Sequence, residues 1–192
     1  MDRIKLEKSL VGEISHYRNL PYFINTPQNP LQKLSVQVGK GNWRQIQKYT
    51  ASLAKKQKVK LTPQNTYAFQ KKNKIGLDCS ALAYHLLDFL YQKKHHRSIK
   101  PYLIGTNGKT GPRRLSANLL TSPPNAIVTK NPQPGNLIRQ KNGHHLLFIY
   151  KVSPDKIYYV HSSRQSRGVK LGNIKKNKSL LFYQLLATKR GE

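Results

Sequence analysis

The strongest periodic pattern of hydrophobic residues lies between residues 79 and 90. Apolar side chains recur there at intervals of three and four residues, which places them in one stripe along an α-helix. The stripe consists of Cys79, Leu82, Ala83, Leu86, Leu87 and Leu90. Cationic side chains follow near the C-terminal end of this stripe, where they complement the helix dipole. The pattern predicts a helix that starts near Asp78 and packs one face against a core.

From Gly135 onward the pattern changes to short runs that are typical of β-strands. The runs are Asn136–Gln140, Leu146–Val152, Lys156–His161, Gly168–Ile174 and Leu180–Ala187. Their short connections indicate neighbouring antiparallel strands. A helix followed by an antiparallel meander is an α+β pattern. We therefore expect an α+β fold in which the helix packs on an antiparallel sheet of about five strands.

The remaining segments have weaker patterns. Residues 3–17 favour a short helix, and residues 42–57 a longer one that Asn42 can cap. Proline and glycine mark residues 20–41 and residues 105–134 as loops.

These patterns divide the chain into an N-terminal arm, residues 1–41, and a main domain, residues 42–192. The length of 192 residues suits one domain with an appended arm. No window approaches the ~18 continuous apolar residues of a membrane span. The first eight residues lack the apolar core of a secretory signal. We expect a soluble monomer, and the sequence does not specify its compartment.

The composition is dominated by positive charge. There are 35 Lys and Arg residues against 7 Asp and Glu, a formal net charge of +28. Such a surface attracts nucleic acid, anionic lipid or an anionic wall polymer. Lysine outnumbers arginine by 25 to 10 and is spread along the chain, which favours a non-specific polyanion over base reading by arginine.

The same composition excludes several kinds of chemistry. Asp78 and Asp88 are the only acids in the middle of the chain. A glycosidase needs two facing carboxylates, and a two-metal nuclease needs several acidic ligands. The chain has few acidic residues for either kind of active site. One cysteine, Cys79, rules out an internal disulfide and a multi-cysteine zinc site. No metal or cofactor is predicted.

Cys79 is either a buried small hydrophobe or a reactive thiol, and its place at the start of a helical stripe fits both. Cysteine catalysis needs a thiolate, a nearby base and a group that orients the base. The N–H groups and the dipole at a helix start favour a thiolate. Of the seven histidines, the pair His144-His145 begins one expected strand and His161 ends the next, so these are the candidates for the base.

Four segments resemble the NlpC/P60 family of papain-like cysteine peptidases. Leu77–Leu82 is similar to the Asp-Cys-Ser-Gly motif that opens the catalytic helix of that family. Gln133–Ile138 resembles its Pro-Gly-Asp-Leu strand, and Gly143–Tyr150 its histidine-bearing strand. Ile157–Ser163 resembles the strand that supplies the orienting residue. The order of the motifs is that of the family, and the likeness covers roughly residues 70–175.

The chain departs from the family pattern at two positions. Ala81 stands for the glycine of the first motif, and Asn136 for the aspartate of the second. Neither change removes a catalytic group. The family's usual signal peptide and wall-binding repeats are not visible. This departure affects the expected substrate and location more than the expected chemistry.

The resemblance implies a papain-like NlpC/P60 core in residues 42–192 and a thiol hydrolase. Cys79 would be the nucleophile, His145 the general base and acid, and His161 the group that fixes the imidazole tautomer. The implied reaction is attack on an amide, formation of an acyl-enzyme and hydrolysis. The usual substrate of the family is a peptide bond of peptidoglycan, and a basic protein would adhere to an anionic cell wall.

A register argument favours His145 over His144. Neighbouring residues on a strand point to opposite faces, so only one of the two can meet Cys79. If Ser153-Pro154-Asp155 is a three-residue loop, Val152 pairs with Lys156 and Leu147 with His161. His145 then shares a face with His161, whereas a two-residue loop would assign the role to His144.

Two rival interpretations remain open. The first is a non-enzymatic, highly basic nucleic-acid-binding protein, which the charge and the 11 tyrosines favour because aromatic and cationic side chains grip single strands. The second is a related acyl transferase or amidase on the same scaffold, since a fold does not fix a substrate.

Overall fold

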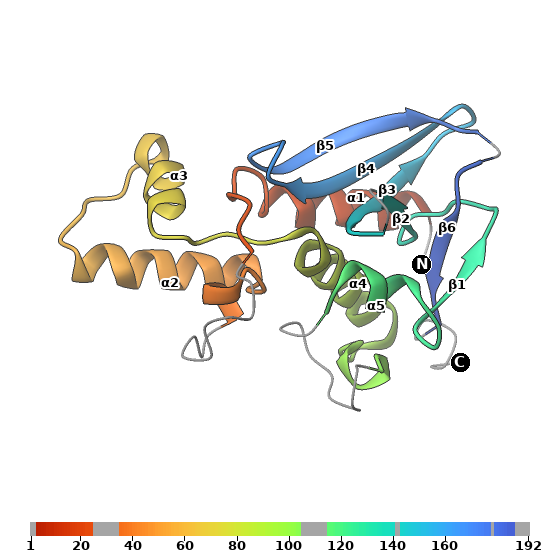
Figure 1. Cartoon of the computed structure of the whole chain (residues 1–192), viewed down its shortest axis with the longest axis horizontal. Coiled ribbons are helices and arrows are strands. Elements are labelled where there is room, and N and C mark those ends of the chain that lie inside the picture. The colour runs from red at the N-terminus through yellow and green to blue at the C-terminus, as the bar shows by residue number, and fades with distance from the viewer. Residues whose placement is uncertain (1–2, 25–34, 105–114, 141–142, 178, 187–192) are drawn as a thin grey trace.

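The computed structural model describes residues 3–24, 35–104, 115–140, 143–177 and 179–186 and has an α+β fold (Figure 1). The helices of these residues are α1 (Arg3–Ser15), α2 (Trp43–Lys56), α3 (Pro63–Lys72), α4 (Cys79–His95) and α5 (Ala117–Thr121). The strands are β1 (Ala126–Thr129), β2 (Leu137–Gln140), β3 (His145–Val152), β4 (Lys156–Ser163), β5 (Gly168–Lys175) and β6 (Phe182–Leu185). They form one antiparallel sheet in the order β1-β6-β2-β3-β4-β5. The predicted α+β class is confirmed, and the sheet has six strands rather than about five.

The additional strand lies in the stretch 105–134 that the sequence predicted as loop. Strand β1 pairs with β6, from Ala126 opposite Leu185 to Thr129 opposite Phe182. Helix α5 precedes it and is capped by Ser116. The loop prediction was wrong for these two elements because four or five residues are too few to show a period. Residues 105–114 of the same stretch lie outside the described residues.

Helix α4 begins at Cys79, as the hydrophobic stripe predicted, and packs against β3 and β4. Asp78 caps it, because its Oδ1 accepts a hydrogen bond from the N–H of Ala81 at 2.8 Å. Every residue from Cys79 to Leu87 is buried. The first half of the helix is therefore enclosed on all sides rather than along one stripe.

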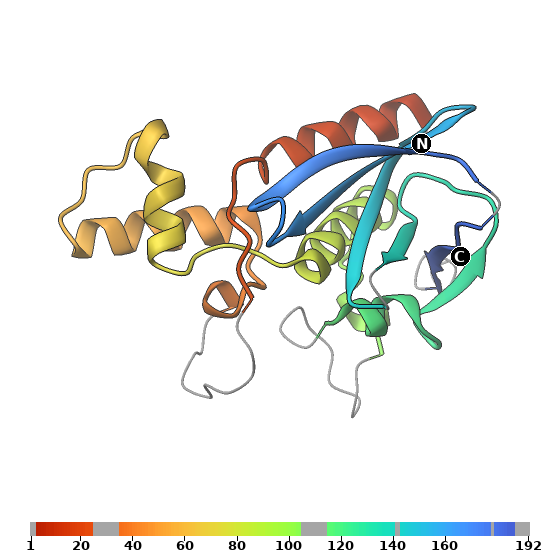
Figure 2. The same ribbon diagram turned by 45° about the horizontal axis from the view of Figure 1, so that its top comes forward.

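The N-terminal segment is part of the core rather than an arm. Leu10, Ile14 and Tyr17 belong to the same buried cluster as the apolar residues of α4. Helix α1 packs on α4 and β3, and in Figure 2 it runs along the sheet. The predicted boundary at residue 41 consequently separates segments that share one core.

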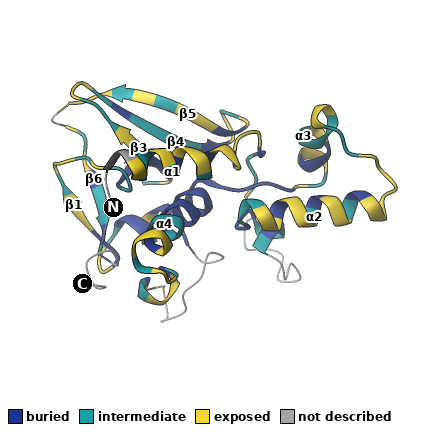
Figure 3. Ribbon diagram, turned by 180° about the vertical axis from the view of Figure 1, so that it is seen from behind, coloured by how far each residue is buried: buried dark blue, intermediate teal, exposed yellow. Residues whose placement is uncertain are grey.

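Helices α2 and α3 extend to one side of the sheet (Figures 1 and 2). Asn42 caps α2 in a reciprocal capping box with Gln45, as the sequence suggested. Helix α3, which the prediction missed, has the same kind of cap at Thr62 and a proline at its first position. Seen from behind, much of α2 is exposed, whereas the first half of α4 is buried (Figure 3).

Strand β3 is buried on both of its faces. Leu146 and Phe148 belong to the cluster that contains α4, whereas Leu147 and Ile149 belong to a second cluster with Ile157 of β4. Alternating side chains point to opposite faces of a strand, which explains why β3 reads as a continuous apolar run.

The β3–β4 hairpin differs from the predicted register at its loop and agrees with it nearer the helix. Val152 pairs with Ile157 instead of Lys156, so the loop is one residue longer than predicted. A β-bulge at Tyr150 compensates, and Phe148 lies opposite Val160. The pair Phe148–Val160 is in the register that the sequence predicted, in which Leu147 would lie opposite His161.

Candidate active site

The sulfur of Cys79 lies where the start of α4 meets the start of β3. Its Sγ is 4.0 Å from the carbonyl oxygen of His144. The backbone N–H groups of Leu146 and Ser80 also hydrogen-bond to the sulfur. The thiol therefore contacts the main chain on both sides of His145. Cys79 is 9% exposed, which is less than expected for a nucleophile at a helix end.

The surroundings of Cys79 favour the thiol over the thiolate. Burial raises the pKa of Cys79 above its ordinary value, and the negative charge of Asp78 raises it further. The N–H of Leu146, the ammonium of Lys40 and the N–H of Ser80 oppose this increase without reversing it. The start of α4 thus does not ionise Cys79 by itself, contrary to the expectation from the helix dipole, and a base must accept the proton.

His145 and His161 form a hydrogen-bonded pair. Nε2 of His145 lies 2.9 Å from Nδ1 of His161, with the rings edge to face at a centroid distance of 5.1 Å. His145 is buried and His161 is half-buried. The ring of Tyr159, on the same face of β4, packs edge-on against His161. The structure therefore brings together the two histidines that the sequence analysis named.

The neighbouring histidine is placed differently. The side chain of His144 is exposed, and only its carbonyl oxygen faces Cys79. This is the alternation that the register argument required of adjacent strand residues. His85, in the middle of α4, is buried and shares a hydrogen bond of 3.1 Å with the carbonyl oxygen of Lys40.

A buried lysine lies beneath the start of α4, and the sequence analysis did not identify it. The Nζ of Lys40 pairs with Asp78 Oδ2 and donates hydrogen bonds to Ser80 Oγ and to the carbonyl oxygen of Leu115 at 2.8 Å. Three acceptors satisfy the three protons of the ammonium group, which makes its burial tolerable. This network fixes Asp78, and Asp78 in turn fixes the first turn of α4.

Tyr22 is the second residue near the thiol that the sequence analysis missed. The backbone of residues 21–23 runs beside Leu77, with hydrogen bonds from Leu77 N–H to the Pro21 oxygen and from Phe23 N–H to the Leu77 oxygen. Burial raises the pKa of Tyr22, and the charges of Cys79 and Asp78 raise it further. The backbone pairing with Leu77 thus places Tyr22 near the start of α4.

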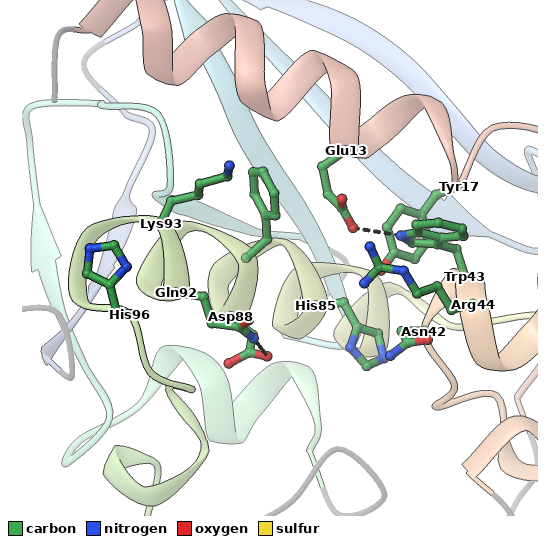
Figure 4. Close-up of a pocket in the computed structure, with 11 residues that line it drawn as sticks. Glu13, Tyr17, Asn42, Trp43, Arg44, His85, Asp88, Gln92, Lys93 and His96 are labelled. Atoms are coloured by element: carbon green, nitrogen blue, oxygen red, sulfur yellow. Dashed lines mark hydrogen bonds between the residues drawn. The ribbon is translucent and has the colours of Figure 1, made fainter.

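A cavity lies where α1, α2 and α4 meet (Figure 4). Its volume is about 480 Å³, and its lining includes Glu13, Trp43, His85 and Asp88. The indole N–H of Trp43 donates to Glu13 at 2.9 Å, and Asp88 accepts from Ser98 and from the N–H of Ile99. The lining includes neither Cys79 nor His145 or His161, so the cavity is separate from the chemistry at Cys79.

Within the described parts of the chain, no group of three or more histidine, cysteine or acidic side chains is placed to hold a metal ion. None of the described helices combines the length and the apolar character needed to cross a membrane. No protein-family model, no curated protein and no solved structure matches the chain.

Proposed function

We propose that the protein is a cysteine hydrolase that cleaves an amide bond through an acyl-enzyme, with Cys79 as the nucleophile. One observation carries the proposal. The only thiol of the chain contacts the backbone on both sides of His145, and the ring of His145 is held by a second imidazole, His161. A nucleophile, a base and an orienting group are the three parts that cysteine catalysis requires.

The hydrogen bond between the imidazoles assigns their roles in this mechanism. His161 engages Nε2 of His145, so Nδ1, the ring nitrogen nearer the His145 backbone, is the one that would act on the sulfur in this mechanism. When Nε2–H donates to His161, Nδ1 is unprotonated and accepts the proton of Cys79 as the sulfur attacks the carbonyl carbon. The same nitrogen then returns the proton to the leaving amine. His161 is the positioning residue that fixes this tautomer.

The start of α4 contributes to the charged intermediate. The N–H of Ala81 donates to Asp78 and that of Ser80 to the sulfur. The N–H of Cys79 itself can therefore stabilise the oxyanion that forms when the thiol attacks. Lys40 and Asp78 hold this turn in place. Hydrolysis of the acyl-enzyme then requires one water molecule, activated by His145 in its second role as base.

The resemblance to NlpC/P60 peptidases supports a peptide of bacterial cell-wall material as the substrate. In the proposed site, nucleophile, base and orienting residue come in turn from the start of a helix and from two neighbouring antiparallel strands, which is the order in that family. The high positive charge favours retention on an anionic wall. An amidase or acyl transferase would use the same residues and differ in the leaving group or in the acceptor.

The test is hydrolysis of purified peptidoglycan, followed by separation of the released peptides. Cys79→Ser and Cys79→Ala should lose activity by a factor of roughly 10⁴ or more, since without the thiol no acyl-enzyme forms. Both variants should keep the circular dichroism spectrum of the wild type. Turnover comparable to the wild type in either variant would exclude Cys79 as the nucleophile.

A further inference from the structure

A second cavity, of about 450 Å³, is lined in part by residues 21–24, and Tyr22 of this segment pairs with Leu77, two residues before the proposed nucleophile. Three segments distant in sequence form it: residues 21–24, helix α3 and the turn that follows β4. The residues used below are Tyr22, Phe23, Tyr67, Lys71, Arg164 and Arg167. The cavity takes its aromatic walls from the first two segments and its cations from the last two.

The cavity adjoins the site through the backbone of Leu77, two residues before Cys79. Residues 21–23 pair with Leu77 on one side, and Ser162 Oγ donates to the Leu77 oxygen at 2.7 Å. Arg164 follows two residues later, three residues after His161. Tyr22 connects the two regions, because it pairs with Leu77 and also lines the cavity. The charge of Cys79 raises its pKa and that of Arg164 lowers it.

The cavity has cations and no acids. Lys71, Arg164 and Arg167 are exposed, and none of them has an ion-pair partner among the residues that the structure describes. The cavity between α1 and α2 has both signs of charge, because Glu13 and Asp88 line it together with Arg44 and Lys93. A net charge of +28 alone would place cations near any cavity. Two other cavities also have linings without acids. The pairing of two arginines in one lining, in a chain rich in lysine, distinguishes this cavity from them.

The walls of the cavity are held in place by the backbone. Tyr67 donates its hydroxyl proton to the carbonyl oxygen of Arg167 at 2.5 Å, which ties α3 to the turn after β4. A Cβ atom on Gly76 would lie 2.2 Å from the Pro21 oxygen, so the chain approaches residues 21–23 as closely as only glycine permits. The cations therefore project from fixed segments, and little ordering is needed when a ligand binds.

From this arrangement we infer that the cavity is a subsite for a carboxylate of the substrate, next to the amide bond that Cys79 attacks. The planar guanidinium groups of Arg164 and Arg167 match a carboxylate in geometry and charge. The preferred substrate class is thus a peptide with a free carboxylate close to the scissile amide, in preference to the same peptide amidated there. This inference rests on the proposed function, because a subsite has meaning only beside a working nucleophile.

The test uses alkylation of Cys79, which needs no knowledge of the natural substrate. N-bromoacetyl-glycine and N-bromoacetyl-β-alanine have a carboxylate at two distances from the reactive carbon, and their carboxamides are neutral controls. Since the chain has one thiol, the second-order rate of each reagent is read directly by mass spectrometry. The variant Arg164→Gln/Arg167→Gln is compared with Lys130→Gln/Lys176→Gln, which removes two charges around a different cavity.

We expect the wild type to react faster with at least one carboxylate reagent than with its carboxamide. The arginine double variant should lose this preference roughly tenfold, the value of one charge-assisted hydrogen bond, while the lysine double variant keeps it. Equal loss in both variants, or no preference in the wild type, would overturn the subsite and leave the nucleophile intact. Failure of native Cys79 to react even with the carboxamides would overturn the proposed function and the subsite with it.

Discussion

Two opposite charges act on the thiol of Cys79, and they belong to one ion pair. Asp78 raises the pKa of Cys79 and Lys40 lowers it, so much of their influence cancels and burial dominates. In the proposed mechanism the sulfur stays protonated until a substrate is present, and His145 takes the proton during the attack. Burial also protects the thiol from adventitious oxidation, which needs an exposed thiolate.

His85 gives a residue-scale prediction about acid stability. Complete burial lowers the pKa of His85 from its ordinary value of 6.5 to about 4. The folded protein therefore binds this proton less readily than the unfolded chain. The resulting stability is present above pH 6.5 and is lost as the pH falls toward 4. Across that range the free energy of unfolding should fall by roughly 3 kcal/mol on account of this residue.

The measurement is urea denaturation at several pH values between 4 and 7, on the wild type and on His85→Gln. Glutamine can still donate to the Lys40 carbonyl and does not titrate. The variant should show a smaller decrease in stability on acidification. Parallel pH profiles for the two proteins would show that His85 is not responsible for the effect.

At the scale of elements, the sequence predicted α4 and the β3–β4 pair well because both have many buried apolar positions. The predicted loop of the hairpin was one residue too short, and the bulge at Tyr150 restored the predicted register at Phe148 and Val160. That compensation was not foreseeable, because a bulge leaves no clear mark in a single sequence. Lys40 and Tyr22 were missed for a different reason. They approach Cys79 through backbone pairing with Leu77, which any residue type can make.

The strand register predicts different effects for two adjacent histidines. His145→Ala should abolish peptidoglycan hydrolysis, with a loss of roughly 10³-fold or more, because no base remains at the thiol. His144→Ala should keep activity within a few fold, since its ring is exposed and only its backbone faces the sulfur. Loss of activity in His144→Ala with retention in His145→Ala would mean that the wrong ring was chosen.

The approach of residues 21–23 to Leu77 predicts a large effect of one methyl group. Gly76→Ala would bring Cβ to 2.2 Å from the Pro21 oxygen, a backbone atom that cannot turn aside. We expect a loss of stability of about 1–3 kcal/mol, as in other overpacked sites. The displacement of Tyr22 should also lower activity in the molecules that remain folded.

Gly12→Ala is the matched control for this change. Gly12 lies within α1, and an added Cβ there meets no atom within 4 Å. Alanine favours the helix, so this variant should be more stable than the wild type by roughly 0.5–1 kcal/mol. Thermal unfolding followed by circular dichroism compares the two variants. Similar stabilities for both would contradict the close approach at Gly76.

At the scale of the whole molecule, composition predicted the charge but not how the chain assembles around the site. The segment predicted as an arm supplies Tyr22 and Lys40 beside Cys79, together with part of the core. The composition of this segment did not predict this role, because the segment pairs with Leu77 through its backbone and contributes only a few apolar residues to the core. The charge leaves open a question that the proposed site does not answer, namely whether the surface binds polyanions broadly or through one groove.

We expect broad, salt-sensitive binding to polyanions, since lysines are spread along the chain. The affinity for heparin, used as a generic polyanion, should fall linearly with the salt concentration on logarithmic scales. Lys130→Gln/Lys176→Gln and Lys55→Gln/Lys56→Gln remove two charges each from distant elements. Because each lysine contributes about one unit or less to the salt slope, both pairs should lower it by similar, small amounts.

Measuring the affinity for single-stranded DNA beside that for heparin decides between wall adhesion and nucleic-acid binding as the function of the charge. A surface that retains the protein on an anionic wall should bind heparin and DNA according to charge density, and Cys79→Ala should bind both like the wild type. If one lysine pair abolishes DNA binding while the other has no effect, the cations act as a compact groove. That result would favour the nucleic-acid-binding interpretation, because base stacking and backbone tracking need a local site, whereas adhesion to a wall polymer needs only the total charge.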